Sequence, residues 1–425
     1  MSPRRYLLAC ASLAGLIAAL FAGFNAWVNP YLLFDNARIP GFNAMKPAVE
    51  TRERLMKSYE ALRRPARTLV IGSSRTDLGL DPGSAAWPEA LRPVYNLSLV
   101  GSGTETGLRF AQHMLAGRAP SAPVPDTLVV GLDFENFLVS PKATERPSAA
   151  TAELEARLML QPDGQPNPDR TRQVLLDHVA GLLSLDALFD SAQTLVANRR
   201  GPQPDLESNG HLSEGRFQQW AQTDGFSTLF NQKNAQALQS LAHRQLGGVD
   251  GAPVALPSRI KPLIEFAALN RMKLVLAIQP SHASRLDMLA HLGYWPAYEH
   301  WKRALCAEVA AARESGKDVS LWDFGGYEAP MQEAVPAPGD RQSRMRWFWD
   351  PVHYNAALGE LMVRAMFFAG SAAPEAATSI GVPLMPQNLE ARLQQVRVDQ
   401  LRYRSDHAAA AGAIRKQVCS FTKAC

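Results

Sequence analysis

The sequence of 425 residues is poor in cysteine and has almost no excess of charge of either sign. Only four cysteines occur, and none has the spacing of a zinc-ligand pair, so a structural zinc site is not expected. Lys and Arg number 44 and Asp and Glu number 40, which gives a net charge of +4. Such a small excess, spread along the chain, argues against a nucleic-acid partner.

Low-complexity composition is absent as well. The 30 prolines and 29 glycines are enough for many defined loops but too few for a collagen-like or disordered chain. Hydrophobic residues make up 46% of the chain and charged residues 20%, which is an ordinary globular composition. A chain of this length can bury one large core or two smaller ones.

One long apolar run is present, at the N-terminus. Residues 6–28, YLLACASLAGLIAALFAGFNAWV, contain no charge and as a helix would extend about 35 Å, enough to cross a bilayer core. Arg4 and Arg5 precede the run, so the positive-inside rule predicts a cytoplasmic N-terminus. A cleaved signal peptide is the alternative, but it should have a shorter apolar region and a clean small-residue cleavage site. We therefore favour a single-pass anchor in the inner membrane with a periplasmic or otherwise extracytoplasmic body.

An extracytoplasmic body permits disulfides. Cys419 and Cys425 flank a short C-terminal loop and are expected either to bridge each other or to stay unpaired at a frayed terminus. Cys306 shares the apolar phase of a helical pattern with Leu305 and Val309, which predicts a buried thiol.

Short apolar runs alternate with helical patterns along the rest of the chain. Buried parallel strands are expected over residues 68–71, 94–99, 127–133, 273–279 and 319–324. Helical patterns cover residues 104–116, 258–270, 285–314 and 355–368. This alternation predicts an α/β fold with a doubly wound, mainly parallel, five-stranded sheet.

The predicted organisation has four parts. Residues 1–28 are the N-terminus and transmembrane anchor, 29–66 a connecting arm, 67–371 the α/β domain and 372–425 a helical tail. A helical insertion, at about residues 137–257, interrupts the α/β domain as a cap or subdomain. Apolar residues at helical spacing mark this insertion: Leu175, Leu176, Val179, Leu182, Leu183 and Leu188.

The candidate chemistry lies at strand ends, because ligands of such sheets bind beyond the carboxyl ends of the strands. The first strand runs into Gly72, Ser73 and Ser74, and a serine at a strand-to-helix turn faces free N–H groups. Asp350 and His353 stand three residues apart after the fifth strand, and a serine needs such a base and orienting carboxylate. Ser74, His353 and Asp350 therefore form a candidate catalytic triad. Ser73 is the alternative nucleophile, and each motif alone also fits an ordinary turn or helix cap.

The order of these motifs resembles the SGNH (GDSL-type) hydrolase superfamily over roughly residues 67–371. Gly72-x-Ser74, Asn96-x-x-x-x-Gly101 and the late Asp350-x-x-His353 carry the resemblance. Together with the apolar N-terminal run they are similar to membrane-anchored bacterial SGNH-like proteins related to polysaccharide O-acetylation and to teichoic acid D-alanyl transfer. The resemblance implies Ser74 as nucleophile, His353 as base, Asp350 as orienting acid, and the N–H groups of Ser74 and Gly101 as oxyanion hole.

This sequence departs from the family at the third motif. Its Gly-x-Asn-Asp would fall on Gly131-Leu132-Asp133-Phe134, which puts an aspartate where the family has an amide of the oxyanion hole. Asp133 would repel an oxyanion unless it is protonated or turned away. Either Asn136 or Asn96 then compensates, or catalysis is weaker or altered. If Asp133 occupies the oxyanion position, Asp133→Asn is expected to raise activity.

Five residues near the predicted site are candidates for substrate contact: Arg75, Asn96, Asp133, His282 and Trp349. Arg75 could bind an anionic sugar group, His282 ends the fourth strand, and Trp349 could stack on a sugar ring. The alternative for Arg75 is an ion pair with a surface acid, and the alternative for Trp349 is packing of the Asp350–His353 loop.

The resemblance implies an esterase or O-acyltransferase that acts on an envelope or exported polysaccharide or on an acylated small molecule, without cofactor or metal. The implied partners are the cytoplasmic membrane and membrane-bound acyl-transport or polymer-synthase proteins. The alternative is a non-catalytic, glycan-binding component of a polysaccharide synthesis or export complex. A lipase or thioesterase, which should have a wider apolar cleft, is a third interpretation.

Overall fold

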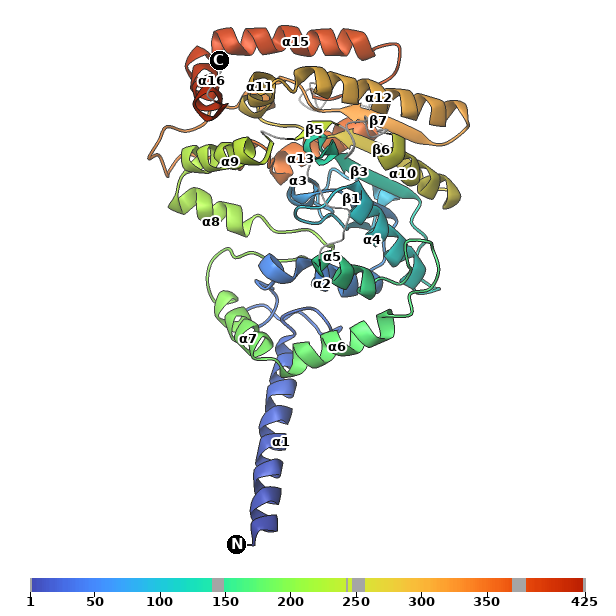
Figure 1. Ribbon diagram of the computed structural model, residues 1–425, viewed down its shortest axis with the longest axis vertical. Coiled ribbons are helices and arrows are strands. Elements are labelled where there is room, and N and C mark those ends of the chain that lie inside the picture. Colours follow the sequence, from blue (N-terminus) through green and yellow to red (C-terminus); the bar gives the residue numbers. More distant parts are fainter. Residues whose placement is uncertain (1, 140–148, 242–243, 247–256, 369–379, 423–425) are drawn as a thin grey trace. The chain divides into compact units, whose positions relative to one another are not determined.

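The computed structural model describes residues 2–139, 149–241, 244–246, 257–368 and 380–422 (Figure 1). The chain divides into two compact units. The anchor unit comprises residues 1–64, 112–120 and 147–216, and the α/β unit comprises residues 65–111, 121–146 and 217–425. Most of the predicted arm and much of the predicted insertion therefore belong to the same unit as the N-terminal apolar helix.

A six-stranded sheet forms the centre of the α/β unit, with strand order β2-β1-β3-β6-β7-β8. Its parallel strands are β1 (Thr68–Ile71), β2 (Val94–Asn96), β3 (Thr127–Leu132), β6 (Lys273–Ile278) and β7 (Val319–Asp323). The order of these five strands is that of doubly wound, flavodoxin-like sheets. The predicted α/β class and mainly parallel sheet are confirmed. A sixth strand, β8 (Val382–Pro383), pairs antiparallel with β7 and was not predicted, because two residues carry no periodicity.

The strands form in short, mostly apolar segments, and β1 and β3 are buried along their whole length. Ile71 pairs with Val130, and Leu132 pairs with Ile278. This register brings the residues that follow β1, β3 and β6 together at one edge of the sheet. The candidate site is built there.

Helices and a small second sheet complete the α/β unit. The α-helices are α3 (Ser74–Gly79), α4 (Thr104–Gly117), α8 (Gly215–Thr223), α9 (Phe226–Leu241), α10 (Pro257–Leu269), α11 (Ala283–His291), α12 (Trp295–Glu314), α13 (Ala356–Phe368), α15 (Leu389–Asp406) and α16 (Ala408–Thr422). Short 3-10 turns are η2 (Glu89–Leu91), η3 (Phe134–Phe137) and η4 (Ala329–Gln332). β4 (Leu138–Val139) pairs antiparallel with β5 (Gln245–Leu246). These two strands join both ends of the insertion, which was predicted to be helical.

The single helix predicted over residues 285–314 is wrong, because the chain forms α11 and α12 instead. Gly293 between them has a φ of 82°, a left-handed conformation that favours glycine and ends a helix. Pro296 then lies in the first turn of α12, where proline is tolerated. Cys306 on α12 is a buried free thiol, as its apolar phase predicted. Cys425 lies outside the described residues, so the predicted Cys419–Cys425 bridge cannot be described.

The anchor unit is helical within the described residues. It contains α1 (Pro3–Val28), α2 (Val49–Glu60) with η1 (Ala61–Arg63), α5 (Ala149–Arg157), α6 (Arg170–Leu183) and α7 (Leu185–Ala197). α1 is long and apolar enough to cross a membrane. Asp177 of α6 accepts hydrogen bonds from Tyr59 Oη at 2.8 Å and from Arg157 Nε at 2.7 Å, and so ties α2, α5 and α6 together.

Candidate active site

Ser74, His353 and Asp350 lie within hydrogen-bond distance of one another, although 279 positions separate the serine from the histidine. Ser74 Oγ is 2.8 Å from His353 Nε2, and His353 Nδ1 is 2.6 Å from Asp350 Oδ2. Ser74 is half-buried, whereas the other two side chains are buried. The serine, the imidazole and the carboxylate thus form the linear arrangement in which a histidine can take a proton from a serine hydroxyl.

Asp350 orients the histidine through its own short loop. Its Oδ1 atom accepts the backbone N–H groups of Val352 at 2.8 Å and of His353 at 2.9 Å. Burial alone would raise the pKa of Asp350, but the neighbouring His353 and its hydrogen bonds lower that pKa to about 2. The carboxylate is therefore ionised at neutral pH and holds the proton of a neutral imidazole on Nδ1. This leaves the lone pair of Nε2 facing Ser74.

The two adjacent serines have different hydrogen-bond partners. Ser73 is the N-cap of α3, and its hydroxyl oxygen accepts the N–H of Arg75 at 3.3 Å while its hydroxyl donates to Asp133. Ser74 is the first residue of α3, and its hydroxyl faces His353. Of the two candidate nucleophiles, only Ser74 is hydrogen-bonded to the histidine.

Two glycines, Gly72 and Gly131, lie against the side chain of Thr76 in α3 and leave it room. A Cβ atom on Gly72 would lie 2.1 Å from Thr76 Oγ1, and one on Gly131 would lie 2.0 Å from the same atom. Side chains at these positions would push α3 away from the strand ends. Two glycines therefore let β1, β3 and α3 approach closely enough to form the site.

The Gly101 turn lies beside the same strand end. Gly101 has a φ of 67°. The N–H of Leu99 and the hydroxyl of Ser102, on either side of it in the chain, each donate a hydrogen bond of 3.2 Å to the carbonyl oxygen of Gly72. Within the part of the chain that the structure describes, neither the Ser74 N–H nor the Gly101 N–H donates to a protein acceptor. Both amides are thus available to an anionic oxygen.

Asp133 is held by three donors, two from the start of α3 and one from the residue that follows β6. Arg75 Nη1 donates to its Oδ1 atom at 2.6 Å, Gln279 Nε2 donates to the same atom at 2.8 Å, and the Ser73 hydroxyl donates to Oδ2. A guanidinium therefore balances its charge, and its hydrogen-bonding capacity is used within the protein. Arg75 is itself buried and also donates to Ser281 Oγ at 2.9 Å. We therefore assign both members of this ion pair a structural role, in place of the substrate contact expected from sequence.

Gln279 was not predicted as a site residue, yet it connects three parts of the site. Its Oε1 atom accepts the Thr76 hydroxyl at 3.0 Å and the Tyr354 hydroxyl at 2.9 Å, while its amide donates to Asp133. The side chain thus links α3, the end of β3 and the loop of His353. Its position directly after β6 was the only signal that sequence reasoning could have used.

Two asparagines that were considered as oxyanion donors have partners in the backbone. The fully buried Asn96 donates to the carbonyl oxygens of Thr76 at 3.2 Å and of Leu80 at 3.1 Å, and so satisfies the end of α3. Asn136 donates to the carbonyl oxygen of Ser102 at 3.2 Å and so braces the Gly101 turn. We assign Asn96 a structural role as well.

His282 is buried and hydrogen-bonded on both ring nitrogens. Nδ1 is 2.8 Å from Ser284 Oγ and accepts the Ser284 N–H at 3.2 Å, while Nε2 lies 2.7 Å from the carbonyl oxygen of Glu333. Burial lowers the pKa of His282 to about 4. A neutral ring that caps α11 explains this residue without a substrate.

Trp349 is the remaining predicted substrate residue, and it lines a cavity of about 220 Å³. The other lining residues are Gln218, Ala221, Gln222 and Arg344. The backbone N–H of Trp349 donates to the carbonyl oxygen of His353 at 2.8 Å, so this wall of the cavity is directly connected to the histidine loop. Phe217 has its ring centroid 5.1 Å from that of His353 and 6.2 Å from that of Trp349. Phe217 lies in the predicted insertion and was missed, because its neighbours give no catalytic motif.

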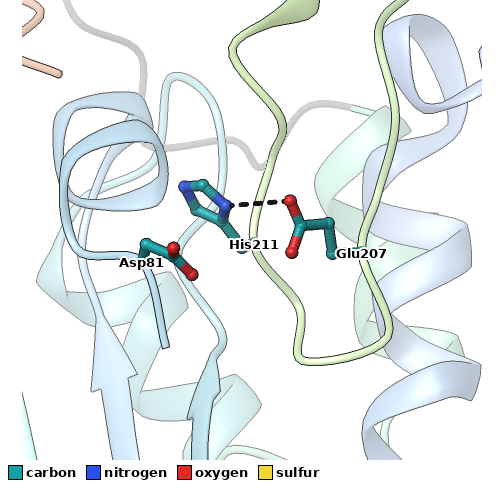
Figure 2. Close-up of side chains that lie close together, drawn as sticks. All are labelled: Asp81, Glu207 and His211. Carbon is teal, nitrogen blue, oxygen red and sulfur yellow. Dashed lines mark hydrogen bonds and ion pairs between the residues drawn. The ribbon is translucent and has the colours of Figure 1, made fainter. Parts of the chain in front are cut away.

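A separate histidine–carboxylate pair lies in the anchor unit. His211 Nδ1 is 3.5 Å from Glu207 Oε1 (Figure 2), and this hydrogen bond lowers the pKa of Glu207. The two residues belong to one tight loop, in which Gly210 has a φ of 83°. Asp81, drawn in the same figure, belongs to the α/β unit. We interpret the Glu207–His211 pair as a loop-stabilising contact.

The chain matches no family model, no curated protein and no solved structure.

Proposed function

We propose that this protein is a membrane-anchored serine esterase or O-acyltransferase of the SGNH type. The observation that carries this proposal is the hydrogen-bonded line from Ser74 through His353 to Asp350. The backbone N–H groups of Ser74 and of Gly101, in the turn bonded to Gly72, have no acceptor among the described residues. They add support, because acyl transfer needs donors for a developing oxyanion.

In the proposed reaction, Ser74 Oγ attacks the carbonyl carbon of an acyl ester while His353 Nε2 takes the hydroxyl proton. The N–H groups of Ser74 and Gly101 stabilise the resulting oxyanion, and ionised Asp350 stabilises the imidazolium. His353 then returns the proton to the leaving alcohol, which departs and leaves an acyl-serine. A sugar hydroxyl or a water molecule attacks the acyl-serine with His353 again as base, which releases the acyl product and restores Ser74.

The cavity beside Trp349 suggests the class of substrate. At about 220 Å³ it is smaller than a typical pocket for a drug-sized ligand, which favours a short acyl group. An indole ring, two glutamine side chains and an arginine in its lining are suited to stacking on and hydrogen-bonding a sugar. We therefore propose an acylated glycan as donor or product, in an extracytoplasmic location set by Arg4 and Arg5 ahead of α1.

A fluorophosphonate probe tests the proposal directly on the full-length protein. We expect covalent labelling of the wild type and complete loss of labelling in Ser74→Ala. Ser73→Ala is the matched control and should still be labelled, since Ser73 caps α3 and is not bonded to His353. Labelling that persists in Ser74→Ala would contradict the assignment of the nucleophile. A folded wild type that no probe labels would favour the non-catalytic, glycan-binding alternative.

A further inference from the structure

Most of the large apolar side chains on the helices α6 and α7 of the anchor unit are exposed. Exposed on them are Leu175, Leu176, Val179, Leu183, Leu185, Phe189 and Val196, with Leu185 at 76% and Phe189 at 63%. The residues buried on the same helices are small or polar: Asp177, Gly181, Ala187, Ser191, Thr194 and Ala197. This is the reverse of a helix packed on a core in water. Such an extended apolar surface marks an interaction site.

This apolar face lies at one end of the candidate membrane span. Asn25 of α1 is fully buried, donates to the carbonyl oxygen of Leu182 at 2.9 Å and accepts the Ser191 hydroxyl at 2.8 Å. The helix from Tyr6 to Phe24 rises about 28 Å, close to the thickness of a bilayer core. If α1 spans the membrane, the contacts of Asn25 therefore lie near the membrane surface.

The direction of the two helices fits a membrane surface. α6 and α7 are bent by 62° from each other at Ser184 and flank the end of α1 (Figure 1). Figure 1 shows α6 running across the direction of α1 and not along it. A helix in this orientation lies in the plane of the bilayer, where amphipathic helices insert their apolar face about 5–10 Å deep.

Charged and aromatic side chains border the apolar face where lipid headgroups would lie. Arg199 and Arg200 are exposed directly after α7, and a hollow of about 550 Å³ lies between them and Phe24 of α1. Trp27, at the same end of α1, is 62% exposed. Arginine beside apolar surface suits anionic phospholipids, and tryptophan is enriched at membrane interfaces.

We propose that α6 and α7 lie on the outer surface of the membrane that α1 crosses. Their apolar face enters the lipid, and Arg199 and Arg200 contact the phosphates of anionic lipids. The proposal rests on the proposed anchoring by α1. A bilayer is favoured over a second protein copy, because the apolar face, the arginines and the interfacial tryptophan all adjoin the span itself.

Photolabelling from the lipid phase tests this contact. The full-length protein is reconstituted in vesicles of phosphatidylethanolamine and phosphatidylglycerol that contain a phospholipid with a diazirine in its acyl chain, and adducts are located by mass spectrometry. We expect adducts on residues 6–24 and on residues 175–196. Leu401 of α15, which is 64% exposed, is the control for an exposed leucine and should carry none. Adducts on residues 6–24 alone would overturn the surface contact but leave the anchor. Adducts on neither segment would overturn both.

A double variant separates a lipid contact from contact with a second copy. Leu176→Gln combined with Phe189→Gln should abolish adducts on residues 175–196 and leave those on residues 6–24 unchanged. Leu401→Gln should change neither set. If the wild type lacks adducts on α6 and α7 and is dimeric in detergent, and the double variant is monomeric, the face is a protein interface and the proposal is wrong.

Discussion

Ser74 is half-buried at the first residue of α3, whereas the adjacent Ser73 is enclosed by the backbone of Arg75 and the carboxylate of Asp133. This difference in setting determines which hydroxyl can reach a substrate. Among the described residues the Ser74 hydroxyl is bonded to His353 Nε2, so its reactivity should depend on this acceptor.

The triad residues should act as one unit. We expect Ser74→Ala and His353→Ala each to reduce hydrolysis of p-nitrophenyl acetate by roughly 10⁴- to 10⁶-fold while unfolding stability stays close to that of the wild type. The double variant should be hardly worse than Ser74→Ala, because each loss disables the same step. Asp350→Ala should be milder. Full esterase activity in Ser74→Ala would refute the mechanism.

The contacts of Asp133 change the expected effect of Asp133→Asn on activity and on stability. From sequence alone a gain in activity is expected if this residue occupies the oxyanion position. The structure instead pairs it with the buried Arg75, so the change leaves a buried cation without its counter-charge. We expect a loss of about 3–5 kcal/mol in the free energy of unfolding and no gain in activity.

Urea unfolding and esterase assays check this, with Asp126→Asn as control. Asp126 forms an exposed ion pair with Arg67, and its loss should cost at most about 1 kcal/mol. Raised activity with unchanged stability in Asp133→Asn would instead put that side chain in the oxyanion hole.

At the scale of elements, His282 makes the junction of β6 and α11 sensitive to pH. Its pKa is lowered to about 4 in the folded protein, from an ordinary value of 6.5, because the ring is buried between Phe230 and Phe348. Between these pH values the unfolded chain binds the proton and the folded protein does not. Stability should therefore fall by about 3 kcal/mol as the pH drops from 6.5 to 4.

His282→Asn tests the origin of this pH dependence, since asparagine still caps a helix. Urea unfolding as a function of pH should show a smaller loss below pH 6.5 for this variant than for the wild type. His300→Gln, a change at an exposed position on α12, should leave the wild-type profile unaltered. An unchanged profile in His282→Asn would assign the acid sensitivity to other groups.

α15 is fixed to the sheet by a buried charge cluster. Arg392 Nε donates to Asp323 Oδ2 at 3.0 Å, Lys302 Nζ donates to the same oxygen at 2.9 Å, and Arg392 Nη2 is 2.8 Å from Glu328. Arg392→Ala should destabilise the protein by about 3 kcal/mol, since it leaves Glu328 without this counter-charge. The same substitution should raise the rate of amide hydrogen exchange in α15. Arg402→Ala, at a mostly exposed residue of α15, is the control, and equal exchange in both variants would contradict the proposed docking role.

At the scale of the whole molecule, the charges before α1 set the expected topology. Arg4 and Arg5 should keep the N-terminus in the cytoplasm. Alkaline phosphatase fused after residue 66 should then be active, since the enzyme folds only in an oxidising compartment. An inactive phosphatase fusion, together with an active cytoplasmic reporter at the same site, would reverse the topology.

The sequence predicted the elements that have a strong local signal. The five parallel strands are short and mostly apolar, and β1, β2 and β3 are buried along their whole length, so such segments are visible without knowledge of their neighbours. β8 was missed because it is two residues long and is defined only by its pairing with β7. The break between α11 and α12 was missed because a helical apolar pattern continues across Gly293.

What the sequence determined by itself was the α/β class, the long apolar helix and the placing of Ser74, Asp350 and His353 at the ends of elements. These follow from local composition and spacing. Tertiary structure alone decided that Ser74 and not Ser73 meets the histidine, and that Asp133 is paired with Arg75. It also decided that the leucines of α6 face outward. Each of these depends on contacts between residues far apart in the chain, which register and burial set and which no local pattern encodes.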